Sequence, residues 1–300
     1  MNTIQKIKGF QDLISSEADT YTFIEETARS TFARYGFQEI RIPILEKTEL
    51  FARSIGGETD IVQKEMYTFP DRKGRSLTLR PEATAGVVRA YIENRLYAQD
   101  PVSKWFTCGP MFRYERPQKG RQRQFHQVNC ELFGTVAPQA DAEVILMLWT
   151  FLRELGLEKL TIELNTLGCP HCRGNYHQAL KAFLSQAGDE DLCPDCQRRK
   201  TVNPLRVLDC KVPSCRDKVA DAPRTIDHVC QDCREHFTTV QSLLDGLSVP
   251  YALNDRLVRG LDYYQRTTFE VVSADIGSQS SVAGGGRYDG LVQALGGPDV

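Results

Sequence analysis

Two predicted strands joined by a short basic segment constrain the fold of this chain most. We predict these strands at 104–114 and 124–134. A connection this short favours an antiparallel pair, because parallel strands need a crossover of about a dozen residues or more. Further strands are predicted near 160–164, 249–254, 266–273 and 279–284, with few helices between them. This order of elements predicts an α+β fold, an antiparallel sheet flanked by helices, and not a Rossmann fold.

Two helices and an edge strand are predicted elsewhere. Apolar residues recur at spacings of three and four within 16–35 and 141–155, which is typical of amphipathic helices. Residues 39–44 alternate strictly and predict a half-buried strand. Pro43 should place that strand at an edge or an interface, because proline cannot donate to a sheet ladder. Pro81 should lie near the first turn of a further helix.

The composition argues against a membrane protein and against nucleic-acid binding by net charge. The 300 residues are 41% hydrophobic and 25% charged, with a net charge of −2. No apolar run approaches the ~18 residues of a membrane span, and the first residues lack the apolar core of a secretory signal. We therefore expect a cytoplasmic protein with no membrane partner, in which any RNA contact uses a local basic patch.

The clearest candidate for such a patch is the segment from Arg113 to Arg123, where the first two predicted strands are joined. It holds five cations and one acid, namely Arg113, Arg116, Lys119, Arg121, Arg123 and Glu115. Taken alone, the segment is equally consistent with a solvated hairpin tip and with an RNA contact.

Two later segments combine an arginine with phenol groups and glycine. They are Arg259-Gly260-Leu261-Asp262-Tyr263-Tyr264 and Gly284-Gly285-Gly286-Arg287-Tyr288-Asp289. Hydroxyl and guanidinium groups suit a small polar substrate with a ring, and glycine lets the backbone approach it closely. On their own, the tyrosines are also consistent with core aromatics of a strand.

A third pair of segments gives these patterns a common interpretation. Phe112-Arg113-Tyr114-Glu115-Arg116-Pro117 precedes the basic loop, and Phe125-His126-Gln127-Val128-Asn129-Cys130-Glu131 follows it. Together the segments resemble histidyl-tRNA synthetase, a class II aminoacyl-tRNA synthetase, and the resemblance extends over nearly the whole chain. It implies a class II synthetase-like fold. It also implies a ligase that uses ATP and Mg²⁺ to activate L-histidine as histidyl-adenylate and then transfers it to tRNA(His).

The resemblance also assigns roles to residues. It implies that Arg113 and Arg259 are catalytic and act at the α-phosphate of ATP, the second in the place where other class II enzymes hold a metal ion. Arginine suits this role because its planar fork donates two parallel hydrogen bonds to an oxyanion. The residues implied for ATP binding are Arg113, Glu115, Arg121 and Phe125. Those implied for histidine binding are Glu82, Thr84, Arg113, Gln127, Glu131, Arg259, Tyr263, Tyr264 and Tyr288. Arg116 and Gln118 correspond to residues that meet the acceptor end of the tRNA.

Residues 169–233 are rich in cysteine and are expected to be rich in loops. Their cysteines form four pairs, Cys169 and Cys172, Cys193 and Cys196, Cys210 and Cys215, and Cys230 and Cys233. Paired thiolates fit tetrahedral Zn²⁺, and eight ligands can fill two four-cysteine sites. Because the segment is poor in apolar residues, we expect the metal to replace a missing core. The alternatives are reduced buried thiols and a redox-sensitive cluster. The prediction rests on spacing and not on the resemblance.

The resemblance to histidyl-tRNA synthetase also predicts the domain organisation. Residues 1–165 and 248–300 should form two parts of a class II catalytic domain, and 166–247 should be an insertion. The family's third class II motif and anticodon-binding domain are absent from this sequence, so we expect a catalytic-core fragment whose own activity has to be tested. Ala83 stands where the family has glycine, a change that should be harmless. Pro43 and its strand resemble the class II dimer interface, which implies a homodimer.

Two rival functions remain open at this point. The first is the synthetase-like regulatory subunit of ATP phosphoribosyltransferase, which binds histidine without ligating it. Arg259, Gln127, Glu131 and the full basic loop argue against it, because that protein typically loses parts of these motifs. The second is a zinc-ribbon nucleic-acid module, which leaves the tyrosine and arginine segments unexplained.

Overall fold

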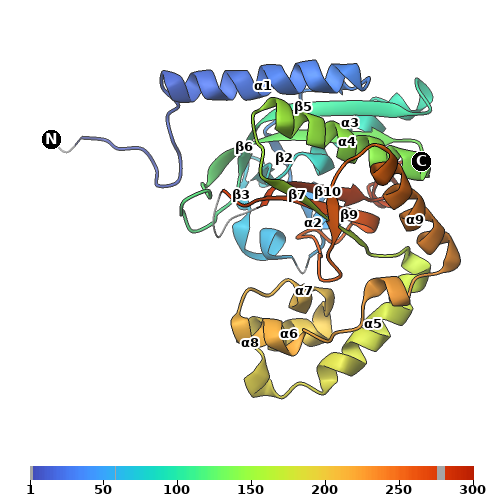
Figure 1. Ribbon diagram of the computed structural model, residues 1–300. Helices are drawn as coiled ribbons and strands as arrows, with labels where there is room; N and C mark the ends of the chain where they lie inside the picture. Colours follow the sequence, from blue (N-terminus) through green and yellow to red (C-terminus); the bar gives the residue numbers. More distant parts are fainter. Residues whose placement is uncertain (1–2, 58, 276–280) are drawn as a thin grey trace. The chain divides into compact units, whose positions relative to one another are not determined.

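The structure is a computed structural model that describes residues 3–57, 59–275 and 281–300. Internal contacts divide the chain into two compact units (Figure 1). The first unit comprises Met1–Val136, Met147–Leu157 and Asp289–Val300. The second comprises Ala137–Leu146 and Glu158–Tyr288.

The first unit contains two three-stranded sheets. Its helices are α1 (Ser16–Arg34), α2 (Thr48–Ile55), α3 (Thr84–Glu93), α10 (Leu291–Ala294) and the second part of α4 (Pro138–Glu154), with short helical turns at Ile61–Glu65 and Leu96–Ala98. One sheet has the order β1 (Gln38–Glu39), β5 (Ser103–Phe112), β6 (Gln124–Phe133). The other has the order β2 (Leu45–Lys47), β4 (Ser76–Leu79), β3 (Tyr67–Pro70). Strands β5 and β6 pair antiparallel from Ser103 opposite Phe133 to Phe112 opposite Gln124, which confirms the predicted hairpin.

The predicted strand at 39–44 is wrong beyond its first residue. The observed β1 ends at Glu39 and pairs parallel with β5, not antiparallel. The guanidinium group of Arg80 donates from Nη1 to the carbonyl oxygens of Ile42 and Pro43, at 2.8 and 3.4 Å. These carbonyls therefore bond a side chain instead of a neighbouring strand, and Pro43 has no N–H to offer a ladder.

The second unit is built on a four-stranded sheet with the order β10 (Ser281–Arg287), β9 (Gln265–Ser273), β7 (Leu160–Thr166), β8 (Tyr251–Leu253). The pairs β10–β9 and β9–β7 are antiparallel, whereas β7 and β8 are parallel. The strand predicted near 279–284 corresponds to β10, and its residues 279 and 280 lie outside the described residues. The helices are the first part of α4, α5 (Pro170–Ser185), α6 (Pro194–Val202), α7 (Leu205–Leu208), α8 (Pro213–Lys218) and α9 (Gln231–Gly246), with short turns at Asp189–Asp191 and Thr225–Asp227.

The cysteine-rich segment is more helical than predicted and has a hydrophobic core. On α5, Tyr176, Leu180 and Leu184 follow one another at spacings of four and are at most 1% exposed. They belong to a buried cluster that also includes Leu192, Leu205 and Val207 from the following elements. The expectation that metal replaces a missing core is therefore wrong, because side chains four apart on one helix face already form that core.

A buried ionic network joins the start of α4 to α9 and β10 within the second unit. Asp141 accepts hydrogen bonds from His236 Nε2 at 2.7 Å and from Arg287 Nη2 at 2.6 Å. The three side chains are 10%, 4% and 6% exposed respectively. Burial acts to raise the pKa of Asp141, but the hydrogen bond from His236 and the charge of Arg287 outweigh it and hold the pKa below the ordinary value of 3.8.

Replacing Asp141 with asparagine should lower the free energy of unfolding by about 3–5 kcal/mol, because it leaves a buried guanidinium without its counter-charge. Urea unfolding at pH 7 measures this loss. Asp275→Asn is the matched control, since Asp275 pairs with Lys159 in an exposed ion pair that should contribute about 1 kcal/mol or less. Because the folded pKa of Asp141 is depressed, its contribution is present above pH ~4 and is lost below it. An Asp141→Asn loss no larger than the control's would contradict the prediction.

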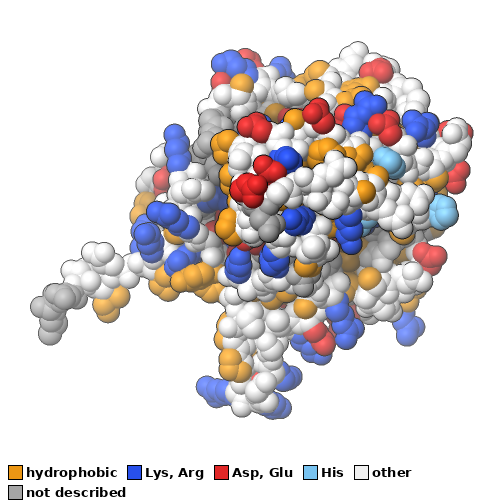
Figure 2. All heavy atoms as spheres, turned by 90° about the horizontal axis from the view of Figure 1, so that it is seen from below, with side chains coloured by type: hydrophobic (Ala, Val, Ile, Leu, Met, Phe, Trp, Pro, Cys, Tyr) orange, Lys and Arg blue, Asp and Glu red, His pale blue; other side chains and the backbone are white. Residues whose placement is uncertain are grey.

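The surface carries charges of both signs. On the face drawn in Figure 2, basic and acidic side chains are interspersed with small apolar areas. Among the described residues, no helix is long and apolar enough to cross a membrane.

Candidate functional site

One face of β6 carries three of the predicted site residues. Phe125, Gln127 and Glu131 occur at even spacing along β6, so their side chains point to the same face of the sheet. Glu131 is 4% exposed, and Asn129, between Gln127 and Glu131 on that face, donates from Nδ2 to its carboxylate at 2.5 Å. Asn129 was not among the predicted site residues, although the alternating pattern itself indicates it. The strand therefore presents an aromatic ring, two amides and a carboxylate in a row.

Arg113 connects this face to the segment before α3. Its Nε donates to the carbonyl oxygen of Pro81 at 2.9 Å, and its guanidinium carbon lies 5.2 Å from the centre of the Phe125 ring. A guanidinium at this distance from an aromatic ring is attracted to the ring face. Arg113 is thus held by contacts to the segment before α3 and to β6.

Glu82 and Thr84 are both buried at the start of α3. The carboxylate of Glu82 accepts hydrogen bonds from the backbone N–H groups of Thr84 at 2.7 Å and Ala85 at 2.9 Å. Burial raises the pKa of Glu82, while these hydrogen bonds and the charge of Arg113 act in the opposite direction. Each carboxylate oxygen has two lone pairs, so Glu82 can cap the helix and still accept from an ammonium group.

The basic loop is a tight turn with an internal ion pair. Arg121 contacts Glu115 at 2.9 Å, and the backbones of Gln118 and Arg121 exchange two hydrogen bonds. Arg116 and Gln118 are exposed at this tip. The structure therefore places two of the four residues predicted for ATP binding, Glu115 and Arg121, against each other. It leaves the two residues predicted for tRNA accessible.

The second unit gathers the other predicted residues. The ring of Tyr263 lies 4.6 Å from that of Tyr264 and 5.7 Å from that of Tyr288, measured between centroids. Arg259 forms an ion pair with Glu270 at 3.2 Å, and a Cβ atom built on Gly284 would lie 2.5 Å from Arg259 Nη1. Similarly, a Cβ on Gly286 would lie 2.7 Å from the Thr267 carbonyl oxygen and 3.0 Å from the Tyr264 ring. Gly286 therefore leaves room for the backbone of β9 and the Tyr264 ring, and Gly284 leaves room for the Arg259 guanidinium group where it lies.

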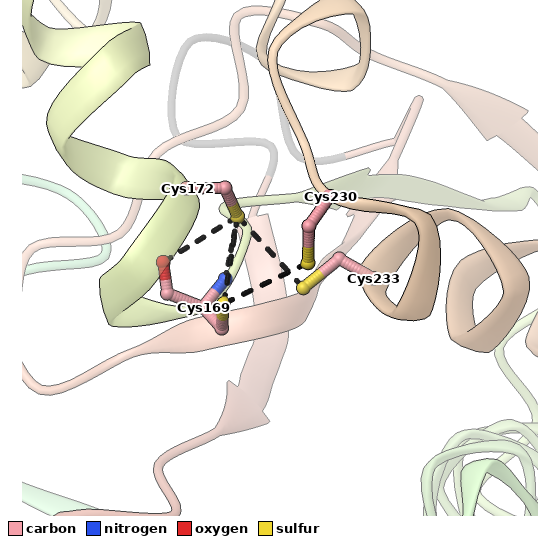
Figure 3. A group of neighbouring side chains, drawn as sticks. All are labelled: Cys169, Cys172, Cys230 and Cys233. Carbon is pink, nitrogen blue, oxygen red and sulfur yellow. Dashed lines mark hydrogen bonds between the residues drawn. The ribbon is translucent and has the colours of Figure 1, made fainter.

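The first cysteine cluster joins the N-termini of α5 and α9 (Figure 3). The Sγ atoms of Cys169 and Cys172 are 3.6 Å apart, those of Cys169 and Cys230 are 3.9 Å apart, and those of Cys172 and Cys233 are 3.8 Å apart. A tetrahedron with Zn–S bonds of about 2.3 Å has edges of about 3.8 Å. A disulfide needs about 2.05 Å between sulfurs, so the group fits a metal and not a bridge.

The second cysteine cluster has the same form. Cys193, Cys196, Cys210 and Cys215 place their sulfur atoms within 4.8 Å of one another, as the first cluster does. The Sγ atoms of Cys193 and Cys210 are 3.8 Å apart. The structure therefore brings the eight cysteines into two groups of four and pairs each Cys-x-x-Cys with a distant partner, which spacing alone does not specify.

The comparisons with known proteins decide the family. A family model described as histidyl-tRNA synthetase matches residues 9–299. The chain belongs to the histidyl-tRNA synthetase family. It is 65% identical over 298 residues to the histidine–tRNA ligase of Maridesulfovibrio salexigens, covering 99% of this chain and 72% of that protein. It is 57% identical over 297 residues to the histidine–tRNA ligase of Desulforapulum autotrophicum, covering 99% of this chain and 70% of that protein.

Solved structures of the synthetase family agree with the fold. The apo histidyl-tRNA synthetase of S. aureus superposes with a TM-score of 0.78 at 35% identity, covering 99% of this chain and 69% of that one. A Bacillus halodurans structure described as an ATP phosphoribosyltransferase regulatory subunit/histidyl-tRNA synthetase superposes with a TM-score of 0.73 at 20% identity, covering 99% of this chain and 79% of that one, a likeness of fold alone. The predicted class II synthetase-like α+β fold is confirmed, and the regulatory-subunit alternative is less well supported than the ligase.

Proposed function

We propose that this chain carries the histidine-activating core of a histidine–tRNA ligase. In this reaction a carboxylate oxygen of L-histidine forms a bond to the α-phosphorus of ATP, and the bond to pyrophosphate breaks. The histidyl group of the resulting adenylate then passes to tRNA(His). The observation that carries the proposal is the face of β6, where Phe125, Gln127 and Glu131 follow the order of the family's motif beside a fixed Arg113.

The first unit supplies the groups for the nucleotide and for one side of the amino acid. Arg113 has N–H groups for the α-phosphate and the substrate carboxylate, where two parallel hydrogen bonds stabilise developing negative charge. Phe125 offers a ring on which adenine stacks. When ATP binds, the ion pair between Arg121 and Glu115 would separate. Arg121 could then contact a terminal phosphate, and Glu115 could accept a hydrogen bond from the adenine edge. ATP is used with Mg²⁺ in this family, and the magnesium ion adds charge neutralisation at the phosphates.

Histidine is selected by partners for both ring nitrogens. We assign one N–H of the imidazole to Glu131 and the other ring nitrogen to a phenol of Tyr264 or Tyr288. The α-ammonium group goes to Glu82, Thr84 and Gln127. A pocket built on buried polar partners rejects amino acids that lack them by roughly 10⁴-fold or more, because those partners would be left unpaired. Arg116 and Gln118 are assigned to the acceptor end of tRNA(His), which exposed guanidinium and amide groups can read.

We further propose that both cysteine clusters hold structural Zn²⁺. Four thiolates satisfy the metal completely, so such a site has no open position for chemistry. The first ion would hold the N-termini of α5 and α9 together, and the second would fix α6 against α8 and the segment before it. The metal would add to the hydrophobic core of this region and not replace it.

The same proposal covers the domain arrangement, the cellular location and the oligomeric state. Residues 166–247 form an insertion between the two parts of a catalytic domain, 1–165 and 248–300. The protein is cytoplasmic.

The chain forms a homodimer through the surface near Pro43, where Ile44 and Leu45 are 44% and 40% exposed. Sedimentation of the purified chain should give twice the monomer mass, and Ile44→Glu should reduce it to the monomer.

Histidine-dependent exchange of pyrophosphate into ATP tests the function directly. The chain should catalyse this exchange with L-histidine and not with other amino acids. A chain that binds histidine without any exchange would be a regulatory binding protein, and the ligase proposal would then fail.

A further inference from the structure

A cavity in the second unit is lined by several cations, of which only Arg259 has a part in the proposed reaction. It has a volume of about 250 Å³. Its polar lining consists of Arg173, His177, Asn203, Arg206, Arg259 and Asp262. Three guanidinium groups, one imidazole and one carboxylate therefore line the cavity. The volume is below the ~300 Å³ at which pockets for drug-sized ligands begin, so it suits one compact group.

Two of these side chains lie on one face of α5. Arg173 and His177 are four residues apart, so they are neighbours on the helix surface. The Nε atom of Arg173 and the Nε2 atom of His177 are buried, and neither has a hydrogen-bond partner among the described residues. The Nε atom of Arg259 is also buried and also has no hydrogen-bond partner among the described residues. Buried donors are almost always paired in proteins, because an unpaired one loses its hydration without compensation.

Charge in the cavity points the same way. Burial, together with the positive charges of Arg173 and Lys181, lowers the pKa of His177. Asp262 is itself held by Asn203 Nδ2, at 3.2 and 3.4 Å from its two oxygens. Arg259 and Arg206 have Glu270 and Asp209 as ion-pair partners, at 3.2 and 3.9 Å, whereas Arg173 forms no ion pair among the described residues, so its positive charge favours an anion.

Arg206 has a different task in the same cavity. Its Nη2 donates to the backbone carbonyl oxygen of Gly260 at 2.9 Å, and its Nη1 donates to the backbone carbonyl oxygen of Arg259 at 3.4 Å. It therefore fixes the backbone that carries Arg259. Arg173 and His177, together with the Nε of Arg259, are left as the groups available to a ligand.

We infer that this cavity is a phosphate-binding subsite in which Arg173 and His177, together with Arg259, hold one phosphate group. The chemistry fits because a tetrahedral oxyanion offers acceptors to N–H groups arriving from several directions. Two sources share this chemistry, the phosphate chain of the nucleotide or pyrophosphate and the backbone of the RNA acceptor strand. The subsite itself does not depend on the proposed function, whereas the identity of its source rests on that function.

Binding of inorganic phosphate and pyrophosphate to the whole chain tests the subsite. Isothermal titration should show that Arg173→Gln/His177→Asn weakens binding by about tenfold or more, because two hydrogen bonds to an anion are lost. Arg224→Gln removes the same charge from an exposed arginine that pairs with Asp227, and it should change affinity by less than about twofold. Arg173→Lys keeps the cation and should retain most of the affinity. An unchanged far-UV spectrum and metal content confirm that the double variant is folded.

Two further measurements on the same variants show whether the nucleotide or the RNA supplies the phosphate group. If the nucleotide supplies the phosphate, the KM for ATP in pyrophosphate exchange rises while tRNA binding is unchanged. If RNA supplies it, exchange is unchanged, and tRNA binding weakens and loses about one unit of its salt-dependence slope. Equal phosphate and pyrophosphate affinities for the double variant and Arg224→Gln would overturn the inference. Normal histidine-dependent exchange in that case would leave the proposed function intact, so the two failures are distinguishable.

Discussion

Replacing Arg259 with glutamine should lower the turnover of histidine-dependent pyrophosphate exchange by about 10²–10³-fold, the usual cost of removing one donor aimed at developing charge. Glutamine keeps a polar side chain but loses the positive charge and the two-pronged fork. The ion pair with Glu270 is lost as well, but it is a contact of the resting site and not of the reaction. We therefore expect the effect mainly on kcat, which initial rates at saturating histidine and ATP measure.

Arg256→Gln provides the matched control in the same loop. Arg256 donates from Nη2 to the carbonyl oxygen of Ala220 at 3.0 Å and has no proposed part in the reaction. Its variant should exchange pyrophosphate within about twofold of the parent, as expected for a surface substitution. Similar rates for the Arg256 and Arg259 variants would mean that Arg259 does not act at the phosphate.

The second large effect is expected from the metal. The chain purified without chelator should contain about two zinc ions, one for each group of four cysteines. Cys172→Ser and Cys196→Ser should each reduce the content by about one ion, because each removes a ligand from a different cluster. Structural zinc contributes on the order of 10 kcal/mol in small domains. Chelation should therefore destabilise α5 to α8, so that the helical signal in circular dichroism is lost at a lower temperature than in the metal-bound chain.

Cys108 supplies the control for this experiment. It lies on β5 outside both clusters, and burial raises its pKa to about 12, so its thiol is protonated and slow to alkylate at neutral pH. Cys108→Ala should leave the zinc content unchanged. After chelation, the additional alkylated thiols should be the eight of the clusters. Less than one zinc per chain in elemental analysis, with a thermal melt insensitive to chelator, would end the metal proposal.

Local pattern was sufficient to predict the parts of the fold in which neighbours in sequence are also neighbours in space. The β5–β6 hairpin follows from two strands and a short loop, and α1 and α4 follow from their apolar spacing. The same logic places Phe125, Gln127 and Glu131 on one face of β6. It also indicates Asn129, which the comparison of motifs alone did not single out.

Distant partners account for what the sequence did not predict. The chain after Glu39 leaves the sheet because the side chain of Arg80, some forty residues later, donates hydrogen bonds to the carbonyl oxygens of Ile42 and Pro43. Asp141 meets His236 and Arg287 only through the packing of α4 against α9 and β10. The pairing of Cys169 and Cys172 with Cys230 and Cys233, and not with the nearer cysteines, is likewise set by where α5 and α9 begin.

Simultaneous recognition of the imidazole by Glu131 and Tyr264 is tested most directly by a double-mutant cycle. Pyrophosphate exchange is measured as a function of histidine concentration for the parent, Glu131→Gln, Tyr264→Phe and the double variant. Each single substitution should lower kcat/KM for histidine by about 10-fold or more, and the double variant should lose clearly less than the product of the two. Losses that multiply would mean that the carboxylate and the phenol do not hold the same ring.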